Sequence, residues 1–402
     1  MRPPAIDVLI TGGGLAGQRC CETLRRRGFS GSVAIICEEP LGPYDRPPLS
    51  KGVLADPDQP RPSRLRPDDW YEQNDVQLLS GARASELGTR DRRLLMVDGR
   101  NRERALRYER LLIATGSRPR RLDGIEPGGA VHELRTYEHA LALRAALRER
   151  EGVVAILGAG LIGMEVASSA RALGREVTMI EAFDRPLGRA LPGVLGQWVA
   201  RLHREHGVDV RLATSVRRVR ARGRGAVLEL SDGGRLDATT VLLAAGTEPA
   251  TAWLSSSGLG PGAVMADHRG RTAVPRIFAA GDASSWMDPH LGRSVACQHW
   301  EAAARQGAAV AHTILGLPAD RPRPPMFWSD QHGRRMQFLG RATQDCRVEL
   351  PGEADGGEPF VAWMYDGGRA SAALLVDSPA LMADARRRIE GADLATDRAM
   401  AA

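Results

Sequence analysis

The feature that most constrains this chain is an apolar strand that runs directly into a glycine-rich turn. Residues 153–157 are all apolar, residues 161–173 have the apolar spacing of a helix, and a second strand, 177–180, ends at Glu181. Between the first strand and the helix lie three glycines in the spacing G-x-G-x-x-G: Gly158, Gly160 and Gly163. In such a β-α-β unit the backbone approaches a pyrophosphate at the helix N-terminus, and the acid binds a ribose. The stretch therefore predicts a dinucleotide site.

The same pattern occurs about 145 residues earlier, near the start of the chain. A strand at 6–10, a helix at 15–27 and a strand at 33–36 are expected there, with Glu38 as the following acid and Glu39 as its fallback. The three glycines in this copy are Gly12, Gly14 and Gly17. Two such units predict two bound dinucleotides, and two dinucleotides in one enzyme suggest that a hydride passes between them.

Each half of the chain also contains a second strand that ends in small residues. Residues 107–113 lead into Ala114, Thr115 and Gly116, and residues 241–245 lead into Gly246. Short strands are expected around 76–79, 85–87, 94–97 and 107–113 in the first half, and a small antiparallel meander is expected at 216–236 in the second. This repeated order indicates an internal duplication in which the second unit is inserted into the first.

The chain is expected to return to the first unit at a short strand, 277–280, which ends in Gly281 and Asp282. A carboxylate there can accept hydrogen bonds from the hydroxyls of a bound sugar chain, although an N-cap for the helix expected at 300–315 is an alternative. After a proline-rich linker, strands at 326–331, 335–340, 346–350, 360–365 and 370–376 and a helix at 379–390 form a small C-terminal domain. The residues beyond Gly391 are expected to be frayed.

Composition narrows the class of protein. The formal net charge is +6 and almost all of the basic residues are arginine, but no basic arm with aromatic platforms indicates nucleic-acid binding. An acidic protein partner fits this charge better, and a solvated arginine-rich surface is the alternative. The five cysteines show no C-x-x-C or zinc spacing, so no metal site is expected. No leader and no apolar run long enough to span a membrane is evident, which predicts a cytoplasmic protein without disulfides.

A proline-braced segment, 42–52, contains Lys51, the only lysine of the chain. The adjacent prolines restrict the backbone, and residues 49–51 are expected to open a short helix. This arrangement predicts a positioned cation, with an ordinary surface loop as the alternative.

Several separate motifs, which together cover nearly the whole chain, resemble one family. Beyond the two glycine fingerprints, the strings are Tyr44-x-Arg-Pro-Pro-Leu-Ser-Lys51, Ala114-Thr-Gly116, Gly281-Asp282, His299-Trp300 with Gln306-Gly307, and Phe327-Trp-Ser-Asp-Gln331. The chain is similar to the FAD-dependent, NAD(P)H-using ferredoxin reductases of bacterial P450 and aromatic-ring dioxygenase systems. Two departures stand out: Cys37 replaces a frequent glycine, and Gly13 replaces a frequent alanine.

The resemblance implies an α/β fold with two Rossmann-like dinucleotide-binding domains, the NAD domain inserted into the FAD domain, and a small α+β C-terminal domain. The implied boundaries are 1–116 and 247–320 for FAD, 117–246 for NAD, and 321–402 for the C-terminal domain. Both glycine fingerprints, residues 114–116 and Gly246 would line the cofactors.

The resemblance also implies individual roles. The acids Glu38, Glu181 and Asp282 would hold the FAD adenosine ribose, the NADH ribose and the FAD ribityl chain, respectively. Arg46 would lie along FAD, Trp300 would meet the pyrimidine end of the flavin, and Trp328 would cover the flavin near the docking surface. Lys51 and Glu165 would form an ion pair beside the flavin and are the predicted catalytic residues.

The implied function is transfer of a hydride from NADH to FAD, followed by single electrons to an iron–sulfur ferredoxin that feeds a P450 or Rieske-type oxygenase. Alternatives are an NADH-sensing flavoprotein related to apoptosis-inducing factors, which share two of the strings, and a rubredoxin or other-acceptor reductase. A disulfide reductase would need a cysteine at 40–60, where none occurs. A flavoprotein monooxygenase, which would use oxygen as the electron acceptor, is a further alternative.

Overall fold

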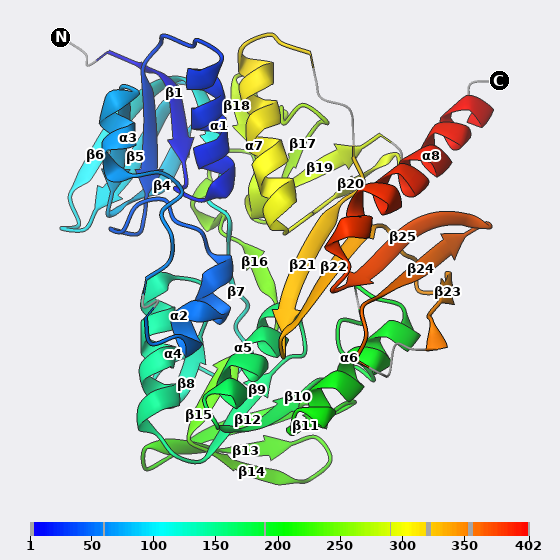
Figure 1. Ribbon diagram of the computed structural model, residues 1–402. Helices are drawn as coiled ribbons and strands as arrows, with labels where there is room; N and C mark the ends of the chain where they lie inside the picture. Colours follow the sequence, from blue (N-terminus) through cyan, green and yellow to red (C-terminus); the bar gives the residue numbers. More distant parts are fainter. Residues whose placement is uncertain are drawn as a thin grey trace. The chain divides into compact units, whose positions relative to one another are not determined.

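The computed structural model describes residues 4–58, 61–188, 190–289, 291–318, 323–352 and 357–400, with side chains described through Gly391 (Figure 1). The chain divides into two compact units. Unit 1 comprises residues 1–46, 62–118 and 247–321, and unit 2 comprises 47–61, 119–246 and 322–402.

Unit 1 is built on a mainly parallel sheet in the order β3-β2-β1-β6, extended by β5 and β4, with β18 paired to β6. Its strands are β1 (Ile6–Thr11), β2 (Val33–Cys37), β3 (Val76–Ser80), β4 (Ala82–Gly88), β5 (Arg93–Asp98), β6 (Glu103–Ile113) and β18 (Ile277–Ala279). Its helices are α1 (Leu15–Arg26), α3 (Asp68–Gln73) and α7 (Trp300–Ile314). A small sheet of β17 (Val264–Ala266), β19 (Ser284–Asp288) and β20 (Arg293–Val295) completes the unit.

Strand β1 shows why this sheet is buried on both faces. Val8 and Ile10 join one apolar cluster, whereas Leu9 between them joins the other. Successive side chains of a strand point to opposite faces, so a continuous apolar run requires cover on both sides, as parallel sheets have. Strand β6 serves two purposes: its last residues pair in parallel with β1 and β18, and its first pair antiparallel with β5.

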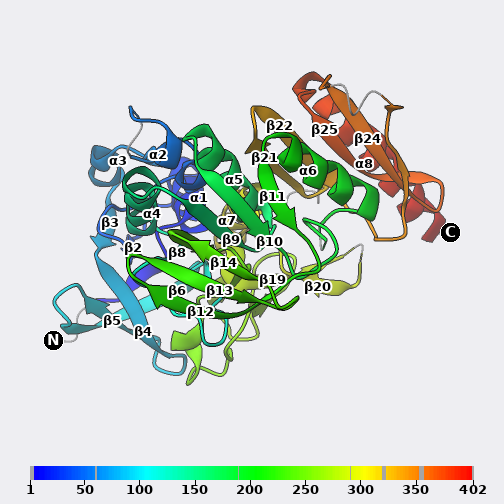
Figure 2. The same ribbon diagram turned by 90° about the horizontal axis from the view of Figure 1, so that it is seen from below.

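Unit 2 repeats the same design. The parallel sheet has the order β11-β10-β9-β15-β8. It comprises β8 (Val131–Glu133), β9 (Val153–Leu157), β10 (Glu176–Ile180), β11 (Val208–Arg211) and β15 (Thr240–Leu243). The helices are α2 (Gly52–Ala55), α4 (Tyr137–Glu149), α5 (Leu161–Ala172) and α6 (Gly193–Glu205), and α2 packs on α4 and α5. The predicted meander is present as β12 (Val216–Arg222), β13 (Gly225–Leu230) and β14 (Arg235–Ala238) (Figure 2).

The C-terminal part of unit 2 is an antiparallel sheet in the order β21-β22-β25-β24-β23, with α8 packed on β25 (Figure 1). Its elements are β21 (Met326–Gln331), β22 (Arg334–Gly340), β23 (Arg347–Glu349), β24 (Phe360–Asp366), β25 (Arg369–Val376) and α8 (Met382–Met400). The α8 backbone is helical to Met400, so this helix extends beyond the one expected at 379–390.

The contact-based units differ from the predicted domains. The proline-braced segment 47–61 packs with unit 2, and so does the C-terminal sheet. The chain leaves unit 1 within β7 (Ser117–Pro119) and returns to it at β16 (Thr247–Pro249), and these two strands pair with each other. Within the described part of the chain, no helix is both long and apolar enough to cross a bilayer.

Helix α7 packs closely on α1 in unit 1 because of one small residue (Figure 1). A Cβ at Gly307 would lie 2.1 Å from the carbonyl oxygen of Ala16. Gly307→Ala should therefore force the helices apart and lower the free energy of unfolding by about 1–3 kcal/mol.

Gly391→Ala is the matched control, because a Cβ at this helical glycine meets no atom within 4 Å. It should leave stability unchanged or raise it by about 1 kcal/mol through helix propensity. Denaturant unfolding followed by circular dichroism measures both variants, and equal effects of the two would contradict the close-packing explanation.

Candidate functional site

The first glycine turn joins β1 to α1, and each glycine has a separate steric role. Gly12 has φ +114°, and a Cβ there would lie 2.0 Å from the Ala114 carbonyl oxygen at the end of β6. A Cβ at Gly17 would lie 2.3 Å from the carbonyl oxygen of Gly12. At Gly14, a Cβ would meet nothing within 4 Å. The outer two glycines therefore allow close packing, and the middle one faces open space.

The second glycine turn, between β9 and α5, has the same geometry. Gly158 has φ +114°, and its Cβ would lie 2.4 Å from the carbonyl oxygen of Ala244, which follows β15. A Cβ at Gly163 would lie 2.2 Å from the oxygen of Gly158, and one at Gly160 would meet nothing within 4 Å. The two turns thus share one steric design.

Both helices begin without a side-chain cap. Gly14 is the N-cap of α1 and Gly160 the N-cap of α5; neither helix has a side-chain cap hydrogen bond or an acidic residue in its first turn. The first N–H groups of a helix need an acceptor, and the positive end of the helix dipole favours an anion. Both turns therefore fit the pyrophosphate of a dinucleotide.

The two departures from the family pattern compensate for each other. A Cβ at Gly13 would lie 2.4 Å from the sulfur of Cys37 at the end of β2. Alanine at 13 would clash with this sulfur, so a cysteine at 37 requires a glycine at 13.

The acids after β2 have different environments. Glu38 is exposed, whereas the carboxylate of Glu39 accepts hydrogen bonds from the Tyr44 hydroxyl at 2.6 Å and from Arg46 at 2.9 Å. The Arg46 guanidinium also lies over the Tyr44 ring, 5.0 Å from its centroid. These contacts favour Glu38 over Glu39 as the ribose-binding acid, and they fix Arg46.

The segment after β18 brings several predicted residues of unit 1 together. The N–H of Gly281 donates to the Gln306 side chain at 2.8 Å, and the Asp282 carboxylate accepts from the Ser117 hydroxyl at 2.8 Å. Burial lowers the pKa of His299, against the opposing effect of the Asp282 carboxylate. Trp300 begins α7, and its indole N–H donates to Asp45 at 2.7 Å. The Asp282 side chain is therefore not an N-cap of α7.

The strand-end turns at 114–116 and 244–246 also match. Gly116 has φ +74° and Gly246 has φ +98°. The carbonyl oxygen of Gly116 accepts from the N–H of Ala250, and that of Gly246 accepts from the N–H of Arg120, each at 2.9 Å. The Thr115 hydroxyl donates to the Ala250 carbonyl at 2.8 Å.

In unit 2, Glu181 lies directly after β10, as predicted. Its carboxylate accepts hydrogen bonds from the N–H of Ala159 at 2.7 Å and of Phe183 at 3.0 Å. Arg185, a possible ligand for a 2′-phosphate, is bound to Asp184 at 2.8 Å and to the Gln344 side chain at 2.9 Å. The other possible ligand, Arg189, lies outside the described residues.

The predicted Lys51–Glu165 ion pair is present in unit 2. The Lys51 Nζ lies 2.7 Å from Glu165 Oε2, and the Ser50 hydroxyl donates to the same oxygen at 2.5 Å. The other oxygen, Oε1, accepts from the Ser329 hydroxyl at 2.7 Å. Trp328, the neighbour of Ser329 on β21, is half-buried. All three partners of Glu165 are donors, so both oxygens of this carboxylate have hydrogen-bond partners although the residue is only 6% exposed.

Sequence reasoning missed the hydroxyl partners Ser50, Ser117 and Ser329. Ser50 and Ser329 lie in the two most specific strings, which was the available signal, but their target is a helix more than 100 residues distant in sequence. Among the described residues, no group of His, Cys, Asp or Glu has metal-binding geometry.

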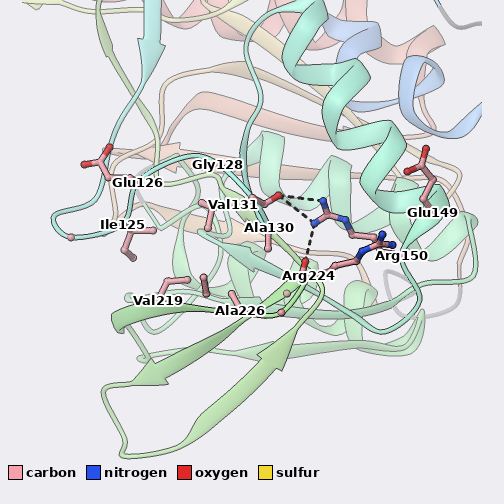
Figure 3. A pocket seen from close by; sticks show the side chains of 15 residues that line it. Ile125, Glu126, Gly128, Ala130, Val131, Glu149, Arg150, Val219, Arg224 and Ala226 are labelled. Carbon is pink, nitrogen blue, oxygen red and sulfur yellow. Dashed lines mark hydrogen bonds between the residues drawn. The ribbon is translucent and has the colours of Figure 1, made fainter.

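One cavity of about 660 Å³ lies in unit 2, between the meander and the turn before β8 (Figure 3). Arg150 lines it, and its guanidinium already donates to the carbonyl groups of Gly129, Arg224 and Thr239. The cavity contains none of the predicted site residues.

The cysteines do not form a redox pair. Cys20, Cys21 and Cys37 are buried, whereas Cys297 and Cys346 are half-buried, and none of the five forms a disulfide. Burial raises the pKa of Cys21 to about 12 and of Cys37 to about 11, and it also raises the pKa of Cys20. At neutral pH these thiols are protonated and therefore poor nucleophiles.

Comparison with protein families gives two matches. Residues 6–307 match the family described as pyridine nucleotide-disulphide oxidoreductase, and residues 326–402 match the family described as reductase C-terminal. Among curated relatives, the ferredoxin–NAD(+) reductase subunit of the benzene 1,2-dioxygenase system of Pseudomonas putida is 36% identical; the match covers 96% of this chain and 93% of that protein. Rhodocoxin reductase of Rhodococcus erythropolis is 33% identical over 88% of this chain and 82% of its own.

Comparison with solved structures gives matches to the same kind of protein as the sequence comparison. The structure of the covalent putidaredoxin reductase–putidaredoxin complex matches with a TM-score of 0.88 and 28% identity, covering 96% of this chain and 93% of that chain. The ferredoxin reductase for the CYP199A2 system from Rhodopseudomonas palustris matches with a TM-score of 0.84 and 28% identity, covering 92% and 91% of the two chains.

The difference in burial predicts the reactivity of the thiols. In the native protein at a pH of about 8, a thiol reagent should modify no more than Cys297 and Cys346, because the other three are buried and protonated. After unfolding, all five should react. The Cys297→Ser, Cys346→Ser double variant should lose the native reaction, and rapid labelling of this variant would show that a buried thiol is reactive.

Proposed function

Because the chain belongs to the pyridine nucleotide-disulphide oxidoreductase family, we propose that it is an FAD-containing, NADH-dependent ferredoxin reductase that supplies electrons to an oxygenase. Its relatives are named as ferredoxin–NAD(+) reductases of dioxygenase systems, and one structural neighbour is a reductase bound to its redox partner putidaredoxin. These relatives align over nearly the whole chain, including the C-terminal sheet.

The observation that carries this proposal is the pair of matching, uncapped helix N-termini in one chain. Each leaves its middle glycine open where a pyrophosphate fits, so the protein can bind two dinucleotides at once. We assign FAD to the turn of α1 and NADH to the turn of α5.

The assignment gives each cofactor its own residues. FAD would be held by the first glycine turn, residues 114–116, Glu38, Arg46, Gly281, Asp282 and Trp300. NADH would be held by the second glycine turn, Glu181 and Gly246, and Trp328 would cover the flavin. FAD held by these residues would supply a hydride acceptor for NADH and a one-electron donor for the partner protein. The role of the protein would be to bind and orient both cofactors so that the nicotinamide and the flavin are pre-organised for hydride transfer.

Lys51 and Glu165 distinguish this chemistry from disulfide reduction. The segment 40–60, where a disulfide reductase would need a cysteine, contains Lys51 and no cysteine. The Lys51 ammonium is held by Glu165 and by the Pro47 carbonyl, 3.2 Å away, so a positive charge is fixed in that position. Placed beside the flavin, this charge would favour the anionic reduced form.

The net charge of +6 supports an acidic ferredoxin as partner, since complementary charge steers association. The lack of a disulfide among the five cysteines and the use of NADH support a cytoplasmic location. The rival with a specific motivation is an NADH-sensing flavoprotein, because related sensors share the strings around Lys51 and Trp328.

Steady-state turnover tests the proposal. Purified, FAD-loaded protein should reduce an iron–sulfur ferredoxin with NADH, read as cytochrome c reduction that depends on added ferredoxin. Raising the salt from about 0.02 M to about 0.2 M should raise the KM for ferredoxin, because screening weakens steering between opposite charges. A long-lived coloured complex with NADH and no ferredoxin-dependent turnover would identify a sensor instead.

Two glycine variants provide the controls. A Cβ at Gly14 or Gly160 meets no neighbouring atom, so valine at either position should be accommodated by the fold but enter the phosphate space. Gly160→Val should stay yellow and lose reduction by NADH, whereas Gly14→Val should lose FAD. The reverse pattern would exchange the two cofactor assignments.

The environment of Glu181 predicts a preference for NADH over NADPH. The 2′-phosphate of NADPH would bring about two negative charges toward this carboxylate, and Arg185 is already bound to Asp184 and Gln344. We expect kcat/KM to favour NADH by about 10²-fold. Glu181→Gln should reduce this ratio about tenfold by removing the like charge.

Glu176→Gln is the matched control, since Glu176 is exposed at the opposite end of the same strand, β10. It should leave the ratio of the two kcat/KM values unchanged. Equal use of both donors by the unmodified protein would show that arginines rather than Glu181 determine the choice.

A further inference from the structure

A continuous line of buried polar side chains leads away from Glu165. Ser329 donates to Glu165 Oε1 at 2.7 Å, and the Gln331 amide N–H donates to the Ser329 hydroxyl at 2.9 Å. The Gln331 oxygen lies 2.9 Å from His203 Nε2, and His203 Nδ1 lies 3.1 Å from His332 Nε2. Glu165 lies on α5, Ser329 and Gln331 lie on β21, and His203 lies on α6. Figure 2 shows the backbone of these three elements.

The polar residues of this line are almost completely buried, which is unusual for polar side chains. Glu165 is 6% exposed, and Ser329, Gln331 and His203 are each 1% exposed. Buried polar groups are costly unless hydrogen-bonded, and a buried network is favourable only when each member has its partner. Here each buried side chain is hydrogen-bonded to the next one in the line. The line reaches solvent at His332, whose ring stacks on that of the exposed His206 with 4.2 Å between the ring centroids.

The hydrogen bonds can run in only one direction while Glu165 is ionised. A carboxylate only accepts, so Ser329 must donate to it and can then accept from Gln331. The Gln331 oxygen is left facing His203 and needs a donor, which places the His203 proton on Nε2. Nδ1 of His203 is then an acceptor, and the His332 proton must lie on its own Nε2.

The turn between β21 and β22 supports this placement. His332 has φ +49° and Gly333 has φ +77°, the left-handed pair typical of a two-residue hairpin turn. Few residues other than glycine adopt this conformation, and histidine is among those that adopt it most often. The His332 N–H also donates to the Ser168 hydroxyl on α5 at 2.7 Å. The turn thus holds the imidazole against His203.

We infer that Ser329, Gln331 and His203 are positioning residues: they form a directional hydrogen-bond relay that holds the Glu165 carboxylate against Lys51 and connects this pair to His332 at the surface. An amide N–H does not readily release its proton, so the relay fixes orientation and does not conduct protons. The inference rests on the proposed function, in which Lys51 lies beside the bound flavin.

Neutral imidazoles are required, since only they donate at one nitrogen and accept at the other. Burial lowers the pKa of His203 to about 4, and burial together with His203, His206 and Arg171 lowers that of His332 to about 3. Both rings are therefore neutral at pH 7. Their contribution to stability is present above the ordinary pKa near 6.5 and is lost as the pH falls toward about 4.

Nitrogen-15 NMR of the histidine rings in the FAD-loaded protein tests the relay without measuring activity. At a pH of about 7, both His203 and His332 should carry the proton on Nε2. In Ser329→Ala the Gln331 amide loses the acceptor that fixes its orientation, so His203 should become a mixture of tautomers. A proton on Nδ1 of His203 in the unmodified protein would overturn the inference.

Ser329→Thr keeps the hydroxyl and should restore the single tautomer. Ser371→Ala is the matched control: Ser371 lies on β25 of the same sheet, and its hydroxyl donates to the Met364 carbonyl, outside the relay. It should leave both histidines unchanged. If Ser329 had only a structural role, the tautomer of His203 would not change in Ser329→Ala. This result would also contradict the inference.

The effect on Lys51 is read from the flavin. Ser329→Ala should shift the midpoint potential of bound FAD and slow its reduction by NADH about tenfold, with the KM for NADH unchanged, since the pair is misplaced rather than the NADH site. If Ser329→Ala leaves both the flavin midpoint potential and the rate of flavin reduction unchanged while ferredoxin turnover is retained, the relay is rejected and the proposed function stands. The predicted tautomers without any ferredoxin turnover would reject the function but keep the relay.

Discussion

The close approach of a glycine to a neighbouring strand end is the constraint on which both halves of this protein depend. In each half, the first glycine of the turn lies where any Cβ would overlap a backbone carbonyl oxygen, that of Ala114 or of Ala244. Since these are backbone atoms, no side-chain rearrangement can relieve the overlap. The turn brings the helix N-terminus to the end of the parallel sheet, which is where such folds bind dinucleotides.

The remaining site residues follow from this arrangement within each unit. In unit 1, Gly307 allows α7 to pack on α1, and its neighbour Gln306 binds the backbone of Gly281. In unit 2, α5 begins at the second glycine turn and carries Glu165, which meets Lys51 from the proline-braced segment and Ser329 from β21. A single helix therefore joins a nucleotide-binding turn, a fixed cation and the C-terminal sheet.

The segment that contains Lys51 distinguishes this chain from the disulphide chemistry named in its family description. The glycine turns and the strand order require no cysteine, and the buried thiols of this chain belong to the core of unit 1. With Lys51 in the segment between the first β-α-β unit and α3, the same fold presents a charge where thiol chemistry would need a nucleophile. This exchange fits transfer of electrons to an external protein.

Much of this could be predicted from sequence, because the signals are local. The glycine spacing, the apolar strand before it and the acid after the second strand lie within about 30 residues, so two dinucleotide-binding units could be predicted from the residues alone. The relationship to ferredoxin reductases was predicted correctly through the resemblance of several motifs. The Lys51–Glu165 pair was also expected, although only through resemblance. The roles assigned to individual residues and the three-domain division stay predictions.

Tertiary structure decided what local patterns cannot contain. The short strands β8, β17, β19 and β20 were not predicted, since three to five residues show too little periodicity. Helix α8 continues to Met400, beyond the end expected at 390. The line from Glu165 to His332 joins residues that are distant in sequence. Gly13 and Cys37 lie in one β-α-β unit, but their compensation depends on the contact of their atoms in the folded chain. The sequence by itself determined which dinucleotide-binding turns form, because their sterics are local; which side chains surround Glu165 was decided only when three distant segments packed around one helix.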